Sequence, residues 1–194
     1  MDHDCYSDDY LRRILTEVHT IAVVGASPRP ERPSHRVMAY LQRRGYRAIP
    51  VNPFAAGTRI NGEMCHARLA DIAEPIDMVD VFRASDQVMA VAGETLKLQP
   101  LPKYFWMQLG IRNDTAAARL EAAGIKVVMN RCPKIEYGRL SSEIAWMGVN
   151  SRTLSSKRAP PPPGIQRLSL DRQSVGGGLT TAADQAASKR DGSA

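Results

Sequence analysis

Short apolar runs alternate with amphipathic stretches along roughly the first 130 residues of the chain. The apolar runs predict buried β-strands, because each is short and contains β-branched or aromatic residues. They are Ile21–Val24, Ala48–Val51, Ile76–Phe82, Tyr104–Met107 and Lys126–Met129. The stretches with helical character are Asp8–His19, Ser34–Arg44, Ser85–Leu98 and Asn113–Ala123. This alternation predicts an α/β fold with a parallel sheet that carries helices on both faces.

Residues that start and stop helices support these boundaries. Ser7 precedes the first helix as a candidate N-cap, and Gly45 and Gly124 directly follow two of the others. Pro100 follows the helix that ends at Leu98. We therefore expect a Rossmann-like, doubly wound parallel sheet of five strands in the order 3-2-1-4-5. Such a sheet binds its ligand at the carboxyl ends of the strands.

The junction after the first strand carries the clearest chemical signal. Ile21–Val24 runs into Gly25, Ala26, Ser27 and Pro28, then into a Pro- and Arg-rich loop with Arg29, and then into the helix that starts near Ser34 and His35. A strand, a tight turn and a helix N-terminus together form an anion site, because unpaired N–H groups and the positive end of the helix dipole face the same point. A phosphate-bearing ligand is the first hypothesis.

The residues that follow the five strands are small, polar or basic. They are Gly25–Pro28, Asn52 with Pro53, Arg83 with Ala84, Gln108–Gly110 and Asn130–Pro133, and Phe82 is the last residue of its strand. None of these positions holds Asp or Glu, which suits an anionic ligand. A dinucleotide is disfavoured, because only Gly25 remains of the G-x-G-x-x-G fingerprint and Asn52 stands where an acidic residue holds the ribose.

Five collinear segments at these strand ends resemble one known family. They are Val-Val-Gly25-Ala-Ser27-Pro28, Pro-Val-Asn52-Pro53, Asp-Met-Val-Asp-Val-Phe82-Arg83, Trp106-Met-Gln108-Leu-Gly110-Ile and Asn130-Arg-Cys132-Pro-Lys134-Ile-Glu. The chain is similar here to the small CoA-binding proteins, which are stand-alone relatives of the CoA-binding domain of the succinyl-CoA synthetase α subunit. The resemblance covers roughly residues 7–140. It implies a Rossmann-like sheet and a ligand that is coenzyme A or a short acyl-CoA.

The resemblance also implies roles for single residues. Gly25, Ala26, Ser27 and Pro28 match the turn that holds the CoA phosphates, and Pro53 matches the proline after the second strand. Phe82 and Arg83 match the segment near the adenine, and Met107, Gln108 and Leu109 match a segment that borders the ligand. The synthetase has a lysine shortly after its proline, where this chain has Phe54, Ala55 and Ala56. We expect Arg29, Arg32 or Arg36 to supply that charge instead.

No set of residues nominates a reaction. The chain contains no HExxH, no P-loop, no GxSxG and no carboxylate pair at the strand ends. It also lacks the second domain that carries the phosphohistidine of the synthetase. We therefore expect a CoA-binding protein without catalysis by the isolated chain. The alternative is a subunit or remnant of an acyl-CoA synthetase that acts with a partner chain. A less favoured alternative is an NAD(P)-binding module.

Several of these residues have a structural alternative. Ser34 can serve as the N-cap of its helix, Phe82 can belong to the core, and His35 can be a solvated surface residue. Cys132 lies between Arg131 and Lys134, and neighbouring cations would lower the pKa of its thiol and favour reaction with the CoA thiol. A free cysteine is also often simply buried.

Charge and composition divide the chain. Residues 1–148 contain 19 Lys/Arg and 17 Asp/Glu, whereas residues 149–194 contain 7 and 3, together with the run Pro160–Pro163. We expect a CoA-binding domain over 1–148 and a disordered basic tail over 149–194. The near-balanced charge of residues 1–148 disfavours specific nucleic-acid binding. Three widely spaced cysteines and the absence of a signal peptide or long apolar segment predict a cytoplasmic protein with no membrane association.

Overall fold

The computed structural model describes residues 3–141, and its centre is a five-stranded parallel sheet. The strands are β1 (Thr20–Val24), β2 (Arg47–Val51), β5 (Met78–Val81), β6 (Tyr104–Met107) and β7 (Lys126–Val128). Every neighbouring pair is parallel. All five expected strands are present, so the Rossmann-like α/β prediction is confirmed.

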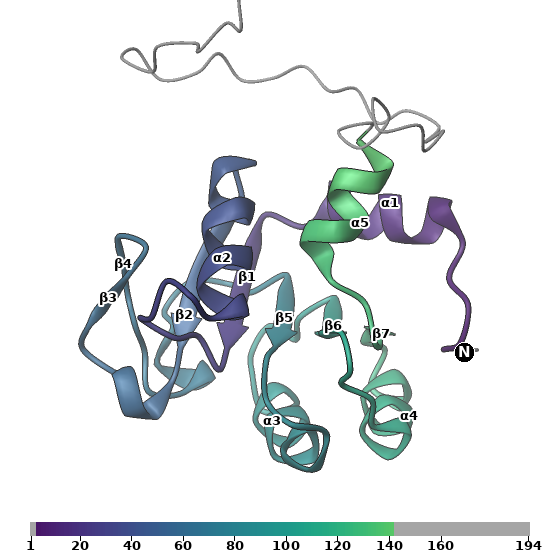
Figure 1. Cartoon of the computed structure of the whole chain (residues 1–194). Helices are drawn as coiled ribbons and strands as arrows, with labels where there is room; N and C mark the ends of the chain where they lie inside the picture. Colours follow the sequence, from purple (N-terminus) through teal and green to yellow (C-terminus); the bar gives the residue numbers. More distant parts are fainter. Residues whose placement is uncertain (1–2, 142–194) are drawn as a thin grey trace, which may run out of the picture. The chain divides into compact units, whose positions relative to one another are not determined.

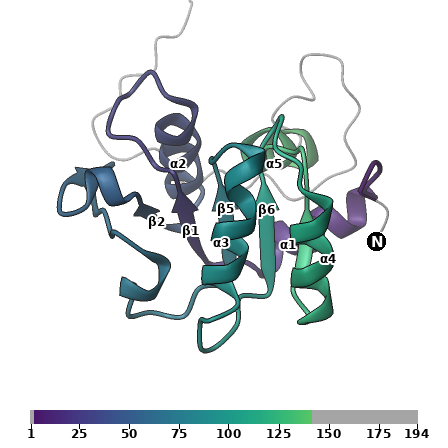
Figure 2. The same cartoon turned by 90° about the horizontal axis from the view of Figure 1, so that it is seen from below.

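Helices cover both faces of the sheet (Figures 1 and 2). On one face lie α1 (Asp8–Glu17), α2 (Pro33–Arg43) and α5 (Pro133–Leu140), and on the other lie α3 (Val88–Thr95) and α4 (Asp114–Ala122). The pleat of the strands explains two separate cores, because successive side chains point to opposite faces. Met78 and Trp106 pack in the core under α2, whereas Val79 and Phe105 pack in the core under α3 and α4.

The strands are arranged in the order β2-β1-β5-β6-β7. In the order 3-2-1-4-5, the fourth strand lies next to the first. Here that position is taken by β5, which is the third of the expected strands and pairs with β1. Outside β2, where a third strand would lie, residues 3–141 contribute only a single parallel bridge between Val51 and His66. The segment between β2 and β5 contains no apolar run long enough for a full strand. The order of the sheet reverses between β1 and β5.

The segment between β2 and β5 folds into small elements that the apolar pattern did not predict. The strands β3 (Arg59–Ile60) and β4 (Glu63–Met64) form an antiparallel hairpin. Its turn is Asn61-Gly62, whose φ angles of 50° and 85° are those of a hairpin turn. This segment also contains two 3₁₀ helices, η1 (Pro53–Ala55) and η2 (Leu69–Asp71), and a third in the described residues, η3 (Ser85–Gln87), follows β5.

Most expected helix ends agree with the structure. Ser7 caps α1 by accepting a hydrogen bond from the N–H of Tyr10 at 3.2 Å, and Asn113 caps α4 in the same way. The expected helix over Ser85–Leu98 is shorter, because it opens with η3 and the α-helix ends at Thr95. The helix α5 was not predicted. The expected domain boundary at residue 148 and the expected tail lie outside the described residues.

Candidate functional site

Gly25 ends β1 and brings the backbone of two strands close together. Its φ of +86° is in the left-handed region, and a Cβ atom on it would lie 3.3 Å from the carbonyl carbon of Phe82. A side chain is therefore disfavoured here by both conformation and space. The N–H of Gly25 donates to the carbonyl of Val51 at 2.8 Å, so it belongs to the sheet. N–H groups that could meet a ligand must come from later residues.

The loop after Gly25 is fastened to the first turn of α2. The hydroxyl oxygen of Ser34 accepts a hydrogen bond from the N–H of Ser27 at 3.1 Å, and Ser27 Oγ accepts one from the N–H of Arg29 at 3.2 Å. The expectation that Ser34 is an N-cap is wrong. Arg32 holds that position, and Pro33 is the first helical residue, where its missing N–H costs nothing.

The first turn of α2 supplies the N–H groups that the Gly25 turn does not. Ser34 and His35 lie in this turn, where no preceding helical carbonyl can accept from their N–H groups. The Ser34 side chain is 4% exposed, and its hydroxyl can still donate its proton. The carbonyl of His35 accepts from Asn61 Nδ2 at 2.9 Å, which links this turn to the β3–β4 hairpin.

Asn52, which follows β2, is a structural link to the same turn. Its Nδ2 donates to the carbonyl of Ala26 at 2.7 Å, and its Oδ1 accepts from the N–H of Phe54 at 3.1 Å. Both ends of the amide are therefore bonded to backbone groups. Ala26 is buried, whereas Ser27 is half-buried and Pro28 is exposed at the edge of the loop.

Three arginines surround the start of α2. Arg29 and Arg32 lie in the loop, Arg36 lies in the helix, and all three are exposed. Within residues 3–141 none of them forms an ion pair. Their positive charge therefore adds to the positive end of the α2 dipole, which makes the start of α2 a favourable place for an anion.

A cavity of about 600 Å³ opens at the carboxyl ends of β1 and β2, on the α3 side of the sheet. Its walls include the last residues of β1 and β2 together with residues of α3 and of the loop before η2. They are Val24, Val51, Pro53, Ala67, Arg68, Arg83, Asp86, Gln87, Ala90, Val91 and Glu94. Next to it, Phe54 is 90% exposed, and the guanidinium of Arg83 lies 6.0 Å from the centre of the Phe54 ring. The expected residues Pro53 and Arg83 are thus brought together.

Beyond Phe82, the strand ends of β5 and β6 carry a buried polar pair. Gln108 Nε2 donates to both carboxylate oxygens of Asp80, at 2.9 and 3.0 Å. Asp80 is fully buried, and burial raises its pKa to about 7. Gln108 is one of the residues expected from the sequence, whereas Asp80 is not. The signal was present, because a charged residue stands inside the apolar run Met78–Val81.

The remaining expected residues lie in three different environments. Met107 is fully buried in the core under α3 and α4, so it is not available to a ligand at the carboxyl edge of the sheet. Leu109, in contrast, is 55% exposed. Phe82 is half-buried and packs against the other core, which agrees with its structural alternative. The position of Met107 follows from the pleat, because it alternates with Gln108.

Cys132 precedes α5 and is 6% exposed. Burial is the largest influence on its thiol and raises the pKa, while the N–H of Ile135, hydrogen-bonded to it, lowers the pKa less. Lys134 lowers the pKa as expected, but burial outweighs this effect and the net shift is upward. Desolvation penalises the thiolate more than Lys134 stabilises it. The structure agrees with the alternative of a buried cysteine.

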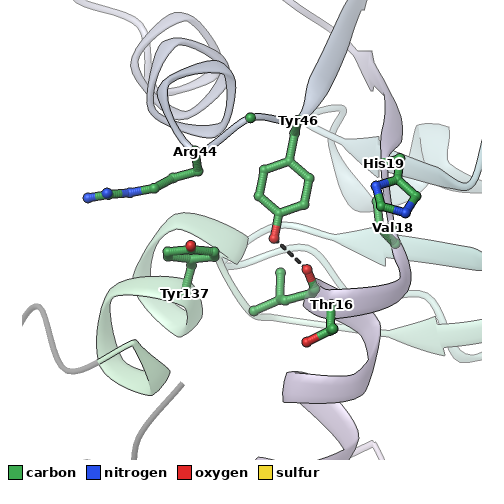
Figure 3. A pocket seen from close by; sticks show the side chains of 8 residues that line it. Thr16, Val18, His19, Arg44, Tyr46 and Tyr137 are labelled. Carbon is green, nitrogen blue, oxygen red and sulfur yellow. Dashed lines mark hydrogen bonds between the residues drawn. The ribbon is translucent and has the colours of Figure 1, made fainter. Parts of the chain in front are cut away.

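A second cavity, of about 360 Å³, lies at the opposite edge of the sheet (Figure 3). Val18 and His19 precede β1, and Gly45 and Tyr46 precede β2, so these walls belong to the amino ends of the strands. The Tyr46 hydroxyl donates to the carbonyl of Leu15 at 2.6 Å. None of the expected site residues lines this cavity, and we place the candidate site at the carboxyl edge.

Two further classes of site find no support in residues 3–141. No group of three His, Cys, Asp or Glu side chains in this range is arranged to hold a metal ion. None of the helices described here is long and apolar enough to span a lipid bilayer.

Comparison with known proteins finds a matching family model and several relatives. The family model of the CoA-binding domain matches residues 19–138. The uncharacterized protein YneT of Bacillus subtilis is 39% identical over 127 residues, which cover 66% of this chain and 91% of that protein. A solved structure from Thermus thermophilus, cell-free ID.343, is 42% identical with a TM-score of 0.66, and the match covers 69% of this chain and 98% of that one.

Two more solved structures complete the comparison. A hypothetical protein from Pyrococcus horikoshii is 36% identical with a TM-score of 0.66, over 72% of this chain and 96% of that one. The dinucleotide-forming acetyl-coenzyme A synthetase 1 of Ca. Korarchaeum cryptofilum is 23% identical with a TM-score of 0.50, over 62% of this chain and 27% of that one, and it shows a common fold alone. From the family match and the identity to its relatives, this chain belongs to the CoA-binding domain family.

Proposed function

We propose that this chain binds coenzyme A or a short acyl-CoA at the carboxyl edge of its sheet. The phosphates are held at the first turn of α2, by the N–H groups of Ser34 and His35 and the Ser34 hydroxyl. The observation that carries the proposal is the meeting of this helix start with three unpaired arginines at the point where the strand order reverses, between β1 and β5. Open α/β sheets bind their ligands at such a point.

The adenine occupies the cavity beside Phe54. Its walls include the apolar side chains of Val24, Val51 and Val91, which suit a purine. Phe54 offers an exposed ring for stacking, and Arg83 lies against that ring with its charge available to a phosphate. The acids Asp86 and Glu94 are also part of the walls, so the cavity suits the neutral base better than the phosphates.

The pantetheine arm runs the other way, across the ends of β5 and β6 toward Gln108. The strand order places the end of β5 next to β1 and the end of β6 beyond it. Residues that follow β5 form one wall of the cavity, and β6 lies on the side away from β2. A ligand that starts in the cavity and crosses the first turn of α2 reaches Gln108 next. Cys132 lies further along this edge, after β7.

The structure around Asn52 favours CoA over a nicotinamide dinucleotide. An NAD site places a carboxylate at the end of the second strand to hold the ribose hydroxyls. This chain has an amide there, and both of its ends are bonded to backbone groups of the protein. The arginines near α2 supply positive charge for the extra phosphate that CoA carries on its ribose.

Calorimetric titration with CoA, NAD and NADP tests the proposal. We expect CoA to bind and the two dinucleotides to bind much more weakly. Arg36→Ala should weaken CoA binding and reduce its salt dependence, because one cation near the phosphates is removed. Arg119→Ala is the matched control, since Arg119 is an exposed arginine on α4, on the opposite face of the sheet. Tight NAD binding without a response to CoA would overturn the proposal.

A further inference from the structure

Asp80 and Gln108 form a buried pair at the carboxyl ends of β5 and β6. The pairing of these two neighbouring strands holds the two residues together. Asp80 is the third residue of β5, and Gln108 directly follows β6, which pairs with β5. The N–H of Gln108 donates to the carbonyl of Val81 at 3.2 Å, so the backbone as well as the side chain is fixed. Gln108 is 5% exposed and Asp80 is 0% exposed.

The two ends of the Gln108 amide differ in their surroundings. The Nε2 end faces Asp80 and contacts both of its oxygens. No group in residues 3–141 donates a hydrogen bond to the Oε1 end. Oε1 also differs from the unpartnered polar atoms of that range that are completely buried. Oε1 is therefore not completely buried, and its lone pairs are free to accept a hydrogen bond.

We propose that Asp80 is a positioning residue that holds the Gln108 amide with Oε1 toward the crevice, where it accepts a hydrogen bond from an amide N–H of the pantetheine arm. This inference rests on the proposed binding of CoA and adds a residue that reads the arm rather than the nucleotide. Pantetheine contains two secondary amides, so a fixed carbonyl acceptor is the group that would recognise it. An ionised Asp80 can only accept, and so it selects the Nε2 end of Gln108.

Protonation of Asp80 removes its preference for the Nε2 end of Gln108. A neutral carboxyl group donates as well as accepts, so its O–H can bond to Gln108 Oε1 while its other oxygen still accepts from Nε2. Oε1 is then withdrawn from the ligand. Burial raises the pKa of Asp80 to about 7, which places this change near neutral pH. Of the titratable groups described, only the Cys132 thiol, at the start of α5, interacts with Asp80, and no cation compensates the carboxylate.

The test compares CoA with the 5′-methyl ester of adenosine 3′,5′-bisphosphate, which lacks the pantetheine arm but shares the base and the titrating 3′-phosphate. Its esterified 5′-phosphate, like the diphosphate of CoA, has no proton that titrates near neutral pH. Both affinities are measured by calorimetry from about two pH units below to about two above the pKa of Asp80. The ratio of CoA affinity to bisphosphate affinity cancels the titration of the shared phosphate. We expect this ratio to rise about threefold to tenfold as the pH increases through about 7, the effect of one hydrogen bond.

Three variants identify the residue responsible. Asp80→Asn should make the ratio independent of pH, because an amide does not titrate. Gln108→Met should also remove the pH dependence and lower the ratio at high pH about threefold to tenfold, because the acceptor is lost. Asp77→Asn is the matched control: Asp77 precedes the same strand at its other end, where it accepts from the N–H groups of His19 and Thr20, and the profile should not change.

The outcomes separate this inference from the proposed function. A pH-independent ratio in the unmodified protein, or a pH dependence that persists in Asp80→Asn, overturns the role of Asp80 and leaves CoA binding intact. If neither CoA nor the bisphosphate binds, both the function and the inference are overturned. If Asp80→Asn does not fold, Gln108→Met decides, and an unchanged profile in that variant contradicts the inference.

Discussion

Asn52 joins the turn after β1 to the end of β2, with its Nδ2 donating to the carbonyl of Ala26 at 2.7 Å. The same side chain accepts from the N–H of Phe54, which is the exposed ring beside the cavity. One amide therefore sets the position of both the turn that leads to α2 and the residue proposed to stack on the adenine. Its role is to hold other groups in place rather than to contact the ligand.

Replacing Asn52 with alanine should loosen both attachments. We expect the free energy of unfolding to fall by about 1–2 kcal/mol and CoA affinity to fall about threefold to tenfold, as measured by urea denaturation and calorimetry. Ser7→Ala is the control, because it removes a cap from α1 at a similar cost of about 1 kcal/mol and, within the described residues, its hydroxyl bonds only to the N–H of Tyr10. Equal losses of CoA affinity in the two variants would contradict this role for Asn52.

Substitution of Gly25 separates backbone strain from close contact. Gly25→Ala places a methyl group 3.3 Å from the Phe82 backbone at a positive φ, and we expect a loss of about 1–3 kcal/mol in unfolding free energy together with weaker CoA binding. Gly45 has a similar φ of +91° with no atom within 4 Å of an added Cβ. Gly45→Ala should therefore show the strain alone and retain CoA affinity. Unchanged binding in Gly25→Ala would argue against a ligand at this turn.

The buried carboxyl of Asp80 should make stability depend on pH. Its pKa is raised to about 7, from 3.8 for an unperturbed carboxyl. Between these values the folded protein keeps a proton that the unfolded chain has released, so the free energy of unfolding falls as the pH rises through this range. Above about 7 this contribution is constant.

Asp80→Asn removes this titration without changing the size of the side chain. Relative to this variant, the unmodified protein should lose stability on the order of a few kcal/mol between about pH 4 and about pH 7. Urea denaturation at several pH values measures the difference. Parallel pH profiles of the two proteins would show that Asp80 is already ionised at low pH in the folded state.

The three cysteines should differ in their reaction with an alkylating reagent. Cys5 is exposed, whereas Cys65 and Cys132 are 2% and 6% exposed, and burial raises the pKa of both buried thiols. We expect Cys5 to react fastest, because the thiolate is the reactive form. Added CoA should slow Cys132 further and leave Cys65 unchanged, as read by peptide mapping. A Cys132 that reacts as fast as Cys5 would show that α5 does not cover it.

The strands and the turn after β1 were predictable because each follows from a local pattern. Ile21–Val24 is an apolar run that stops at a glycine, and both features depend only on neighbouring residues. The place of Ile76–Phe82 in the sheet was not predictable in this way, since it depends on whether the long connection after β2 forms a strand. The Asn61-Gly62 pair was a usable local signal for the hairpin in that connection.

The candidate site was predictable where it depends on strand ends and not where it depends on side-chain partners. Gln108 was expected because it follows β6, but its partner Asp80 lies inside a run that predicts core. Ser34 was interpreted as a cap because serine favours that position, yet Pro33 takes the first helical position and moves the cap to Arg32. The thiol of Cys132 responds to burial, which depends on the packing of α5 and not on its charged neighbours in sequence.

The proposal that CoA binds at the carboxyl edge is tested most directly by ¹H–¹⁵N correlation spectra of the labelled protein, recorded during titration with CoA. We expect the backbone amide signals of Ser34 and His35 to shift most, together with that of Arg83 beside the cavity and the side-chain amide of Gln108. The signals of His19 and Gly45, at the opposite edge of the sheet, should not move. Shifts confined to His19 and Gly45, or no shifts at CoA concentrations well above those found in cells, would contradict the central claim that CoA binds at the carboxyl edge.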